Sequence, residues 1–214
     1  MLLRSLQTLI ESLYDVEARE DVCDFLVTDR ALLPAGTPQQ SDEQLLVADD
    51  DGMLAISLFL DAGLLERLER ADPRLSLNAA NVADYLTALE GVSHFVCVAW
   101  HAQHDRPVSL LHLEMQAEID KYLATCQVMQ SQWPERFPAE LHRLLFESAT
   151  VAPALAGERA RMYGTASRQA ARFCFALEQR LRSLWRQRDL RRLPELCRFY
   201  RLSDQAKLAY VDSL

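Results

Sequence analysis

The residues best suited to chemistry lie in one stretch in the middle of the chain, where histidines and glutamates recur at helical spacing. Glu90 and His94 are four residues apart, and so are Glu114 and Glu118. Side chains at this spacing lie one turn apart on the same face of a helix. If two antiparallel helices meet at a turn near 104–107, His94 faces Glu118 and the two pairs converge. Because carboxylates and imidazoles bind iron, manganese or zinc, the spacing predicts a metal or acid/base site.

His101, nearer the turn, is a fifth candidate ligand. The alternative is structural. Carboxylate-bridged bundles use Glu-x-x-His, whereas Glu90 and His94 form Glu-x-x-x-His, and the predicted long helix over 155–188 has no histidine to complete such a site. A histidine among Val and Phe residues, as His94 is, is typical of a hydrogen-bonded core side chain.

A second stretch with the residues for chemistry reads LLVADDDGML, from Leu45 to Leu54. An apolar run leads into three aspartates and a glycine, which brings carboxylates to the end of a strand. The stretch resembles the first motif of the haloacid-dehalogenase-like phosphatases, in which an apolar strand ends in Asp-x-Asp-Gly. The resemblance implies that Asp49 is a nucleophile and Asp51 an acid/base, with magnesium between them.

The resemblance covers ten residues, and the rest of the chain departs from that family's pattern. Met53 stands where the family has Thr or Val, and the only two lysines, Lys121 and Lys207, are poorly placed to steady a phosphoryl group. The family also needs alternating strands and helices, whereas this motif runs into another strand. Because Asp51-Gly52 is a common two-residue hairpin turn, the pattern predicts a solvated turn.

Hydrophobic periodicity predicts an α+β fold that is predominantly helical, with one β-hairpin over 44–60 attached to long amphipathic helices. Residues 94–100 also suit a strand, but helix is favoured because both flanks are helical in pattern. Residues 25–27 either end the first helix or begin a short strand. A proline-containing loop is expected over 30–43, and no linker divides the chain, so a single domain over 1–214 is predicted. The expected helices cover 2–27, 62–72, 80–104, 108–130, 138–149, 155–188 and 190–213.

Composition is that of a soluble globular protein: of the 214 residues, 50% are hydrophobic and 25% charged. No apolar run reaches the roughly 18–20 residues that span a bilayer, and the start lacks a secretory pattern. The 5 cysteines are scattered, odd in number and never in a CxxC pair, which argues against a disulfide framework and a structural zinc site. We therefore expect a cytoplasmic protein with no membrane segment.

The net charge of −8 is unevenly distributed, because the segment 158–201 holds most of the arginines and few acids. Such a segment is a candidate patch for nucleic acid or an acidic partner. The alternatives are a solvated helix face or pairing with the acidic remainder of the chain. The neighbouring aromatic residues alternate with apolar ones, which indicates core rather than base stacking, so nucleic-acid binding is not expected. The candidate patch comprises Arg180, Arg182, Arg186, Arg188, Arg191 and Arg192.

The chain contains no GxxxxGK[ST] loop, GxSxG elbow, GxGxxG or HExxH motif, and we recognise no family pattern over its whole length. Long amphipathic helices and the charge polarity predict a protein that acts by binding a protein partner or by self-association, for example as a homodimer. The alternative is a metal-dependent enzyme that uses Glu90, His94, Glu114 and Glu118. No cofactor is expected except a divalent metal in that alternative.

Overall fold

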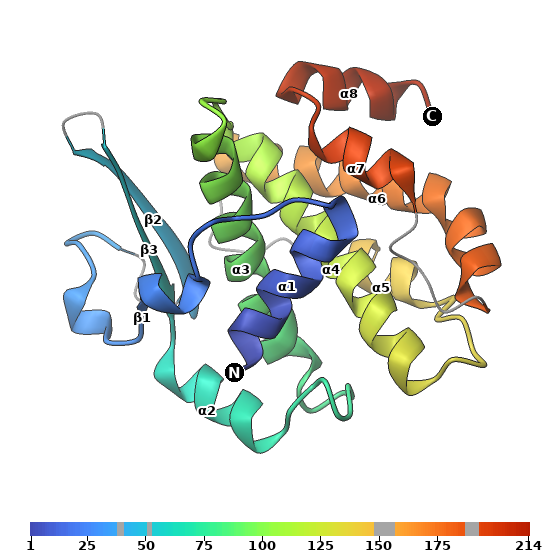
Figure 1. Ribbon diagram of the computed structural model, residues 1–214, viewed down its shortest axis with the longest axis horizontal. Helices are drawn as coiled ribbons and strands as arrows, with labels where there is room; N and C mark the ends of the chain where they lie inside the picture. The colour runs from blue at the N-terminus through green and yellow to red at the C-terminus, as the bar shows by residue number, and fades with distance from the viewer. Residues whose placement is uncertain (38–40, 51–52, 148–156, 187–192) are drawn as a thin grey trace. The chain divides into compact units, whose positions relative to one another are not determined.

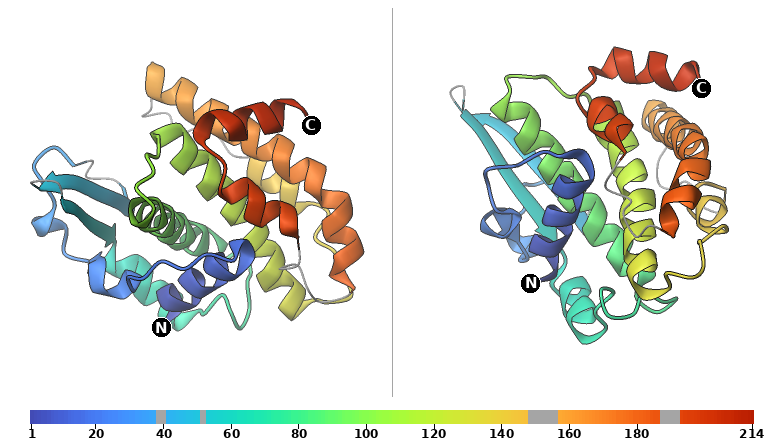
Figure 2. Two further views of the ribbon diagram at one scale, coloured as in Figure 1. Left: turned by 45° about the horizontal axis from the view of Figure 1, so that its top comes forward. Right: turned by 45° about the vertical axis from the view of Figure 1, so that its right-hand side comes forward.

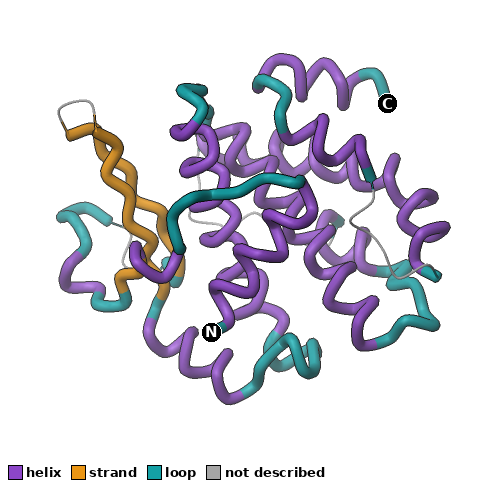
Figure 3. Tube along the Cα trace, in the orientation of Figure 1, coloured by secondary structure: helices purple, strands orange, loops and turns teal. Residues whose placement is uncertain are grey.

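The computed structural model confirms an α+β fold that is predominantly helical (Figure 1). In Figure 3 the strands, drawn in orange, come from the N-terminal part of the chain, and helices dominate the rest of the described residues. The structure describes residues 1–37, 41–50, 53–147, 157–186 and 193–214.

The chain divides into two compact units. Unit 1 comprises Met1–Glu11 and Glu17–Pro107, and unit 2 comprises Ser12–Val16 and Val108–Leu214. Each unit is described by itself, and the prediction of a single domain stays a prediction.

The predicted hairpin forms the sheet of unit 1. β2 (Glu43–Asp50) and β3 (Met53–Leu60) pair antiparallel along their whole length. A third strand, β1 (Leu26–Val27), pairs in parallel with the end of β3 and completes a mixed sheet of order β1-β3-β2. The hairpin of the sequence analysis is therefore confirmed. Asp51 and Gly52, which join the two strands, lie outside the described residues.

The first predicted helix, over 2–27, is wrong in its length. α1 (Leu2–Tyr14) ends where Asp15 adopts a φ of 51°, the left-handed conformation that often follows a helix. The chain continues through a 3-10 turn, η1 (Val22–Phe25), into β1. Val22 lies in this 3-10 turn and not in α1. Its apolar side chain is buried there, so burial of this residue did not require a longer α1.

Two further helices belong to unit 1. α2 (Ala62–Arg70) begins at Asp61, whose side chain accepts hydrogen bonds from two backbone N–H groups of the first turn. α3 (Val82–Gln103) packs against β2, β3 and α2, and it includes 94–100, so the choice of helix there is confirmed. The predicted loop over 30–43 contains a second 3-10 turn, η2, at 30–32.

α3 is the one helix of the described residues that is long and apolar enough to cross a membrane. However, 67% of its most apolar window is buried within the structure. That degree of burial is typical of the core helix of a soluble protein.

Unit 2 is helical in its described part, and α4 packs against α6, which runs beside it in both views of Figure 2. The single helix predicted over 190–213 is wrong: the chain breaks after α7, and the Ser203 side chain caps a new helix by accepting a hydrogen bond from the backbone N–H of Ala206. The helices of this unit are α4 (Leu110–Gln132), α5 (Leu141–Phe146), α6 (Glu158–Trp185), α7 (Pro194–Tyr200) and α8 (Asp204–Asp212).

Candidate functional site

The five predicted metal ligands divide between two helices and two units. Glu90, His94 and His101 lie on α3 in unit 1, whereas Glu114 and Glu118 lie on α4 in unit 2. The Glu118 carboxylate forms an ion pair with Lys121 on its own helix, at 2.6 Å. The prediction that all five side chains converge concerns both units, and it stays a prediction.

Within unit 1, the structure brings a residue that the sequence analysis missed to one of the predicted ligands. Glu43, the first residue of β2, places Oε1 3.5 Å from Nδ1 of His94 on α3. Both side chains are nearly buried, with exposed fractions of 13% and 9%. A carboxylate and an imidazole are thus enclosed together between the hairpin and the helix.

Gly91 makes this approach possible. A Cβ atom added at Gly91 would lie 2.9 Å from Cγ of Glu43 and 2.9 Å from Cδ1 of Leu58, closer than real Cβ contacts come. The missing side chain therefore opens the surface of α3 to β2 and β3. A glycine in the middle of an apolar helix was the only signal in the sequence for a close approach at this point.

The other histidine of α3 and the histidine at its C-cap each contact a backbone carbonyl of the same helix. Nδ1 of His101 lies 2.8 Å from the carbonyl oxygen of Cys97, and Nδ1 of His104 lies 2.7 Å from that of Trp100. Each pair is four residues apart, so these imidazoles hydrogen-bond to the carbonyls of the preceding turn. These contacts orient both rings against the end of α3, and the prediction of His101 as a ligand stays a prediction.

Unit 2 contains a buried polar network centred on Lys207 of α8. The residue is fully buried, and its ammonium donates a hydrogen bond to Oε1 of Gln116 on α4, 2.9 Å away. It also contacts Nε2 of His112. Gln116 in turn donates to Oδ1 of Asp120 at 2.9 Å, and the hydroxyl of Tyr14 donates to the same oxygen. At the other end of the network, Nδ1 of His112 forms a hydrogen bond with the carboxylate of Asp204. The network thus has one carboxylate at each end, Asp120 and Asp204.

The two ends of this network differ in their electrostatics. Burial raises the pKa of Tyr14 well above its usual value, and the neighbouring Asp120 raises it further. Burial also acts to raise the pKa of Asp204, but hydrogen bonds from Ser109 and His112 outweigh that effect and lower the pKa. Tyr14 is therefore a neutral donor, whereas Asp204 is held as a carboxylate beside the His112 imidazole.

The network attaches α8 to α4, and that is the role its geometry supports. Lys207 also lies over the rings of Phe199 and Tyr200, 5.1 Å and 5.2 Å from their centroids. From the sequence, Lys207 entered only as a lysine poorly placed to steady a phosphoryl group. Its one signal was chemical: it is one of two lysines in a chain that otherwise uses arginine.

The structure describes three of the six residues of the predicted arginine patch. Arg180 pairs with Glu195, and Arg182 donates to Glu178 on the same helix and lies over the ring of Phe137, 4.5 Å from its centroid. Arg186 is exposed. Arg188, Arg191 and Arg192 lie outside the described residues. The proposal of an acidic or nucleic-acid ligand therefore stays a prediction.

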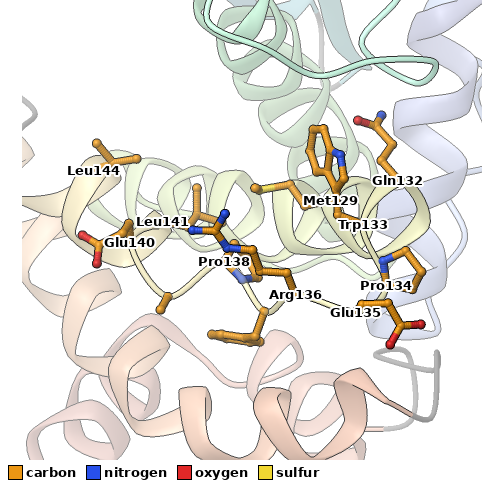
Figure 4. Close-up of a pocket in the computed structure, with 12 residues that line it drawn as sticks. Met129, Gln132, Trp133, Pro134, Glu135, Arg136, Pro138, Glu140, Leu141 and Leu144 are labelled. Carbon is orange, nitrogen blue, oxygen red and sulfur yellow. The ribbon is translucent and has the colours of Figure 1, made fainter.

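A pocket of about 710 Å³ opens in unit 2 where α4 ends and α5 begins (Figure 4). Met129 and Trp133 line it from the end of α4, and Leu141 and Leu144 line it from α5. Trp133 and Leu144 are 43% and 56% exposed, large fractions for such side chains. The remaining lining residues are Gln132, Pro134, Glu135, Arg136, Phe137, Pro138, Ala139 and Glu140.

The wall of this pocket is attached to α6. Phe137 packs edge-on against Trp185, with ring centroids 5.1 Å apart. The guanidinium of Arg182 lies over the Phe137 ring. The side-chain amide of Gln130 donates a hydrogen bond to the carbonyl oxygen of Trp185 at 2.8 Å. Nε2 of His142 lies 2.9 Å from the carbonyl oxygen of Ala171. This stretch, SQWPERFP, falls between the helices predicted over 108–130 and 138–149. Its two aromatic residues, each followed by a proline, were the only signal in the sequence for a pocket here.

Two of the buried cysteines, Cys126 and Cys174, are poor nucleophiles. All five are free, and Cys97, Cys126 and Cys174 are buried. Burial raises the pKa of the Cys126 and Cys174 thiols well above the usual value. Because the thiolate is the reactive form, these side chains pack as small apolar groups.

Comparison with known proteins assigns none of these sites. No protein-family model matches the chain, and neither a curated protein nor a solved structure matches it.

Proposed function

We propose that this protein is a binding module that receives an apolar side chain of a protein partner in the pocket between α4 and α5. The observation that carries the proposal is the exposure of Trp133 and Leu144 on a concave, mainly apolar surface of about 710 Å³. Pockets of this size are typical of sites that enclose a ligand group. Leaving these two side chains in water has a free-energy cost that an occupant would remove.

The distribution of residue types around the pocket supports a protein partner. Its lining is mainly apolar, and it also includes the exposed, charged residues Glu135, Arg136 and Glu140. Protein interfaces combine apolar contact area with polar groups, and Trp, Met and Arg are enriched there.

The attachment of the pocket to α6 supports a preformed site. The contacts of Phe137 with Trp185 and Arg182, and the hydrogen bond of Gln130 to Trp185, fix the loop before any partner arrives. Binding to a preformed surface loses less conformational entropy, so more of the contact energy is available for affinity.

The occupant that fits best is an amphipathic helix with one large apolar anchor and flanking charges of both signs. The anchor would lie between Trp133 and Leu144, and the flanking charges would meet Arg136 and the two glutamates, which lie toward opposite ends of the lining in Figure 4. A second copy of this chain that presents such a helix is the homodimer version of the same proposal.

We place this activity in the cytoplasm. All five cysteines, which lie in the described part of the chain, are free thiols. Free thiols persist in reducing compartments, whereas secreted proteins commonly oxidise them.

The test is a selection of random helical peptides on the immobilised protein, followed by affinity measurement from the change in tryptophan fluorescence. We expect enriched peptides to carry a Leu, Phe or Trp anchor and to shift the emission. Leu144→Asp should weaken their binding at least about tenfold, because it puts a charge on the apolar lining against which the anchor packs. The matched control is Leu75→Asp: Leu75 is 82% exposed and lies outside the pocket, so this variant should bind as the wild type does.

Sedimentation of the protein alone distinguishes the two kinds of partner. A wild-type dimer that Leu144→Asp converts to monomer identifies a second copy as the occupant. Failure of the selection to enrich any anchored peptide, together with a wild type that sediments as a monomer, would overturn the proposal.

A further inference from the structure

The strongest site in unit 1 joins Glu43 of β2 to Glu90 and His94 of α3. Glu90 and His94 each offer a ligand atom, and these atoms lie within 4.8 Å of each other. Oε1 of Glu43 lies 3.5 Å from Nδ1 of His94. Glu43 from the strand and Glu90 from the helix therefore each place a carboxylate near the largely buried His94 imidazole.

The 3.5 Å separation is long for a hydrogen bond but suits two ligands of one metal ion. Zinc binds imidazole nitrogen and carboxylate oxygen at about 2.0–2.2 Å in tetrahedral geometry, which puts neighbouring ligand atoms about 3.4 Å apart. The spacing of the Glu43 and His94 atoms is thus close to the edge of a zinc coordination tetrahedron.

The environment of the Glu43 carboxylate also supports a bound metal ion. Oε1 is buried, and no hydrogen-bond donor reaches it from the part of the chain that the structure describes. A buried carboxylate oxygen without a donor has a large desolvation cost, which a bound cation would offset.

The fold positions this carboxylate by a specific feature. Gly91 lies on α3 between Glu90 and His94, and Oε1 of Glu43 would lie only 3.3 Å from a Cβ at that position. Any larger residue would push the Glu43 side chain away from the helix. The glycine therefore matters to the site itself and not only to the packing of the hairpin.

We propose that Glu43, Glu90 and His94 bind one divalent transition-metal ion, with zinc as the reference metal. One imidazole and two carboxylates form a ligand set suited to zinc, manganese or iron and unsuited to soft thiolate-binding metals. Three protein ligands leave a coordination position for water or substrate, as catalytic zinc sites do. The site is separate from the pocket between α4 and α5, and it would give the chain a Lewis-acid centre besides partner binding.

The test is calorimetric titration of ZnCl₂ into metal-free, full-length protein near neutral pH. We expect one ion per chain, and Co²⁺ in its place should give the visible absorption of a tetrahedral N/O site without a thiolate band. His94→Ala and Glu43→Gln should each weaken zinc binding at least about tenfold, since changes outside the ligand shell alone cost about 10- to 100-fold. Gly91→Ala, which retains all three ligand residues but displaces the Glu43 side chain, should also weaken it.

The controls are a histidine and a glutamate outside the site. His104→Ala removes an exposed imidazole at the end of the same helix, and Glu66→Gln removes a carboxylate that is 71% exposed. Both should bind zinc as the wild type does. Circular dichroism verifies that each variant is folded.

Absence of stoichiometric zinc would overturn the proposal, and so would folded His94→Ala and Glu43→Gln variants that bind zinc normally. Leu144→Asp should leave zinc affinity unchanged, so failure of the metal site and failure of the partner pocket are distinguishable.

Discussion

The ammonium of Lys207 on α8 donates a hydrogen bond to the side-chain oxygen of Gln116 on α4, 2.9 Å away, and neither residue has any exposed surface. The side-chain nitrogen of Gln116 in turn donates a hydrogen bond to the carboxylate of Asp120. The last helix of the chain is therefore held to α4 by polar groups that lack access to water.

Lys207→Ala should lower the free energy of unfolding by about 3 kcal/mol, because removing one partner leaves buried polar groups unsatisfied. Urea denaturation followed by circular dichroism measures the change. Arg70→Ala is the control, since Arg70 forms only an exposed ion pair with Glu66, and it should cause no measurable loss. A loss for Lys207→Ala no greater than that of the control would contradict the structural role of the network.

Asp204 should make stability depend on pH in the acid range. Its pKa is lower in the folded protein than the usual 3.8, so its stabilising contribution is present above the unfolded-state pKa. That contribution is lost as the pH falls through the lower folded-state value. The difference in urea midpoint between wild type and Asp204→Asn should therefore shrink as the pH falls below about 4. A difference that is constant across this range would show that the Asp204 charge is not involved.

The cysteines should react with iodoacetamide in two groups. Cys23 and Cys197 are partly exposed and should be modified in the native protein. Cys126 and Cys174 are fully buried with raised pKa values, so they should react only after unfolding in urea. Peptide mass spectrometry at successive times measures each rate. Modification of Cys126 at the same rate in native buffer and in urea would be inconsistent with this packing.

Asp15 should be a site where glycine stabilises the protein. Its φ of 51° is one that glycine adopts without strain, so Asp15→Gly should raise the free energy of unfolding by up to about 1 kcal/mol. Asp15→Val should lower it by about 1–2 kcal/mol, because a β-branched residue is strained in this conformation. Arg201 donates to the backbone carbonyls of Tyr14 and Asp15, and both variants retain those acceptors. Equal stabilities of the two variants would argue against the left-handed turn.

Much of the fold could be predicted because periodicity is a local signal. The alternation from Met53 to Leu60 predicted the hairpin, and the continuous apolar character of 94–100 within helical flanks predicted α3. The end of α1 could not be predicted, because apolar residues continue to Val27 while the backbone turns at Asp15. The pairing of β1 with β3 joins Leu26 to Leu58, and no local pattern specifies it.

The candidate sites were less accessible to sequence reasoning. Helical spacing identified Glu90 and His94 as neighbours, since four residues make one turn. Glu43 could not be paired with them, because that contact depends on the register of β2 against β3 and on the space that Gly91 leaves on α3. Lys207 lies 91 residues from Gln116 in sequence, so its role depends on how α8 packs.

The sequence by itself determined the secondary-structure class, the hairpin and the spacing of side chains along each helix, because backbone periodicity and turn chemistry act over a few residues. Only the tertiary structure decided which distant side chains share a buried environment. Burial removes water as a competing partner, so the contacts of Glu43 with His94 and of Lys207 with Gln116 acquire their energetic weight only after the elements have packed.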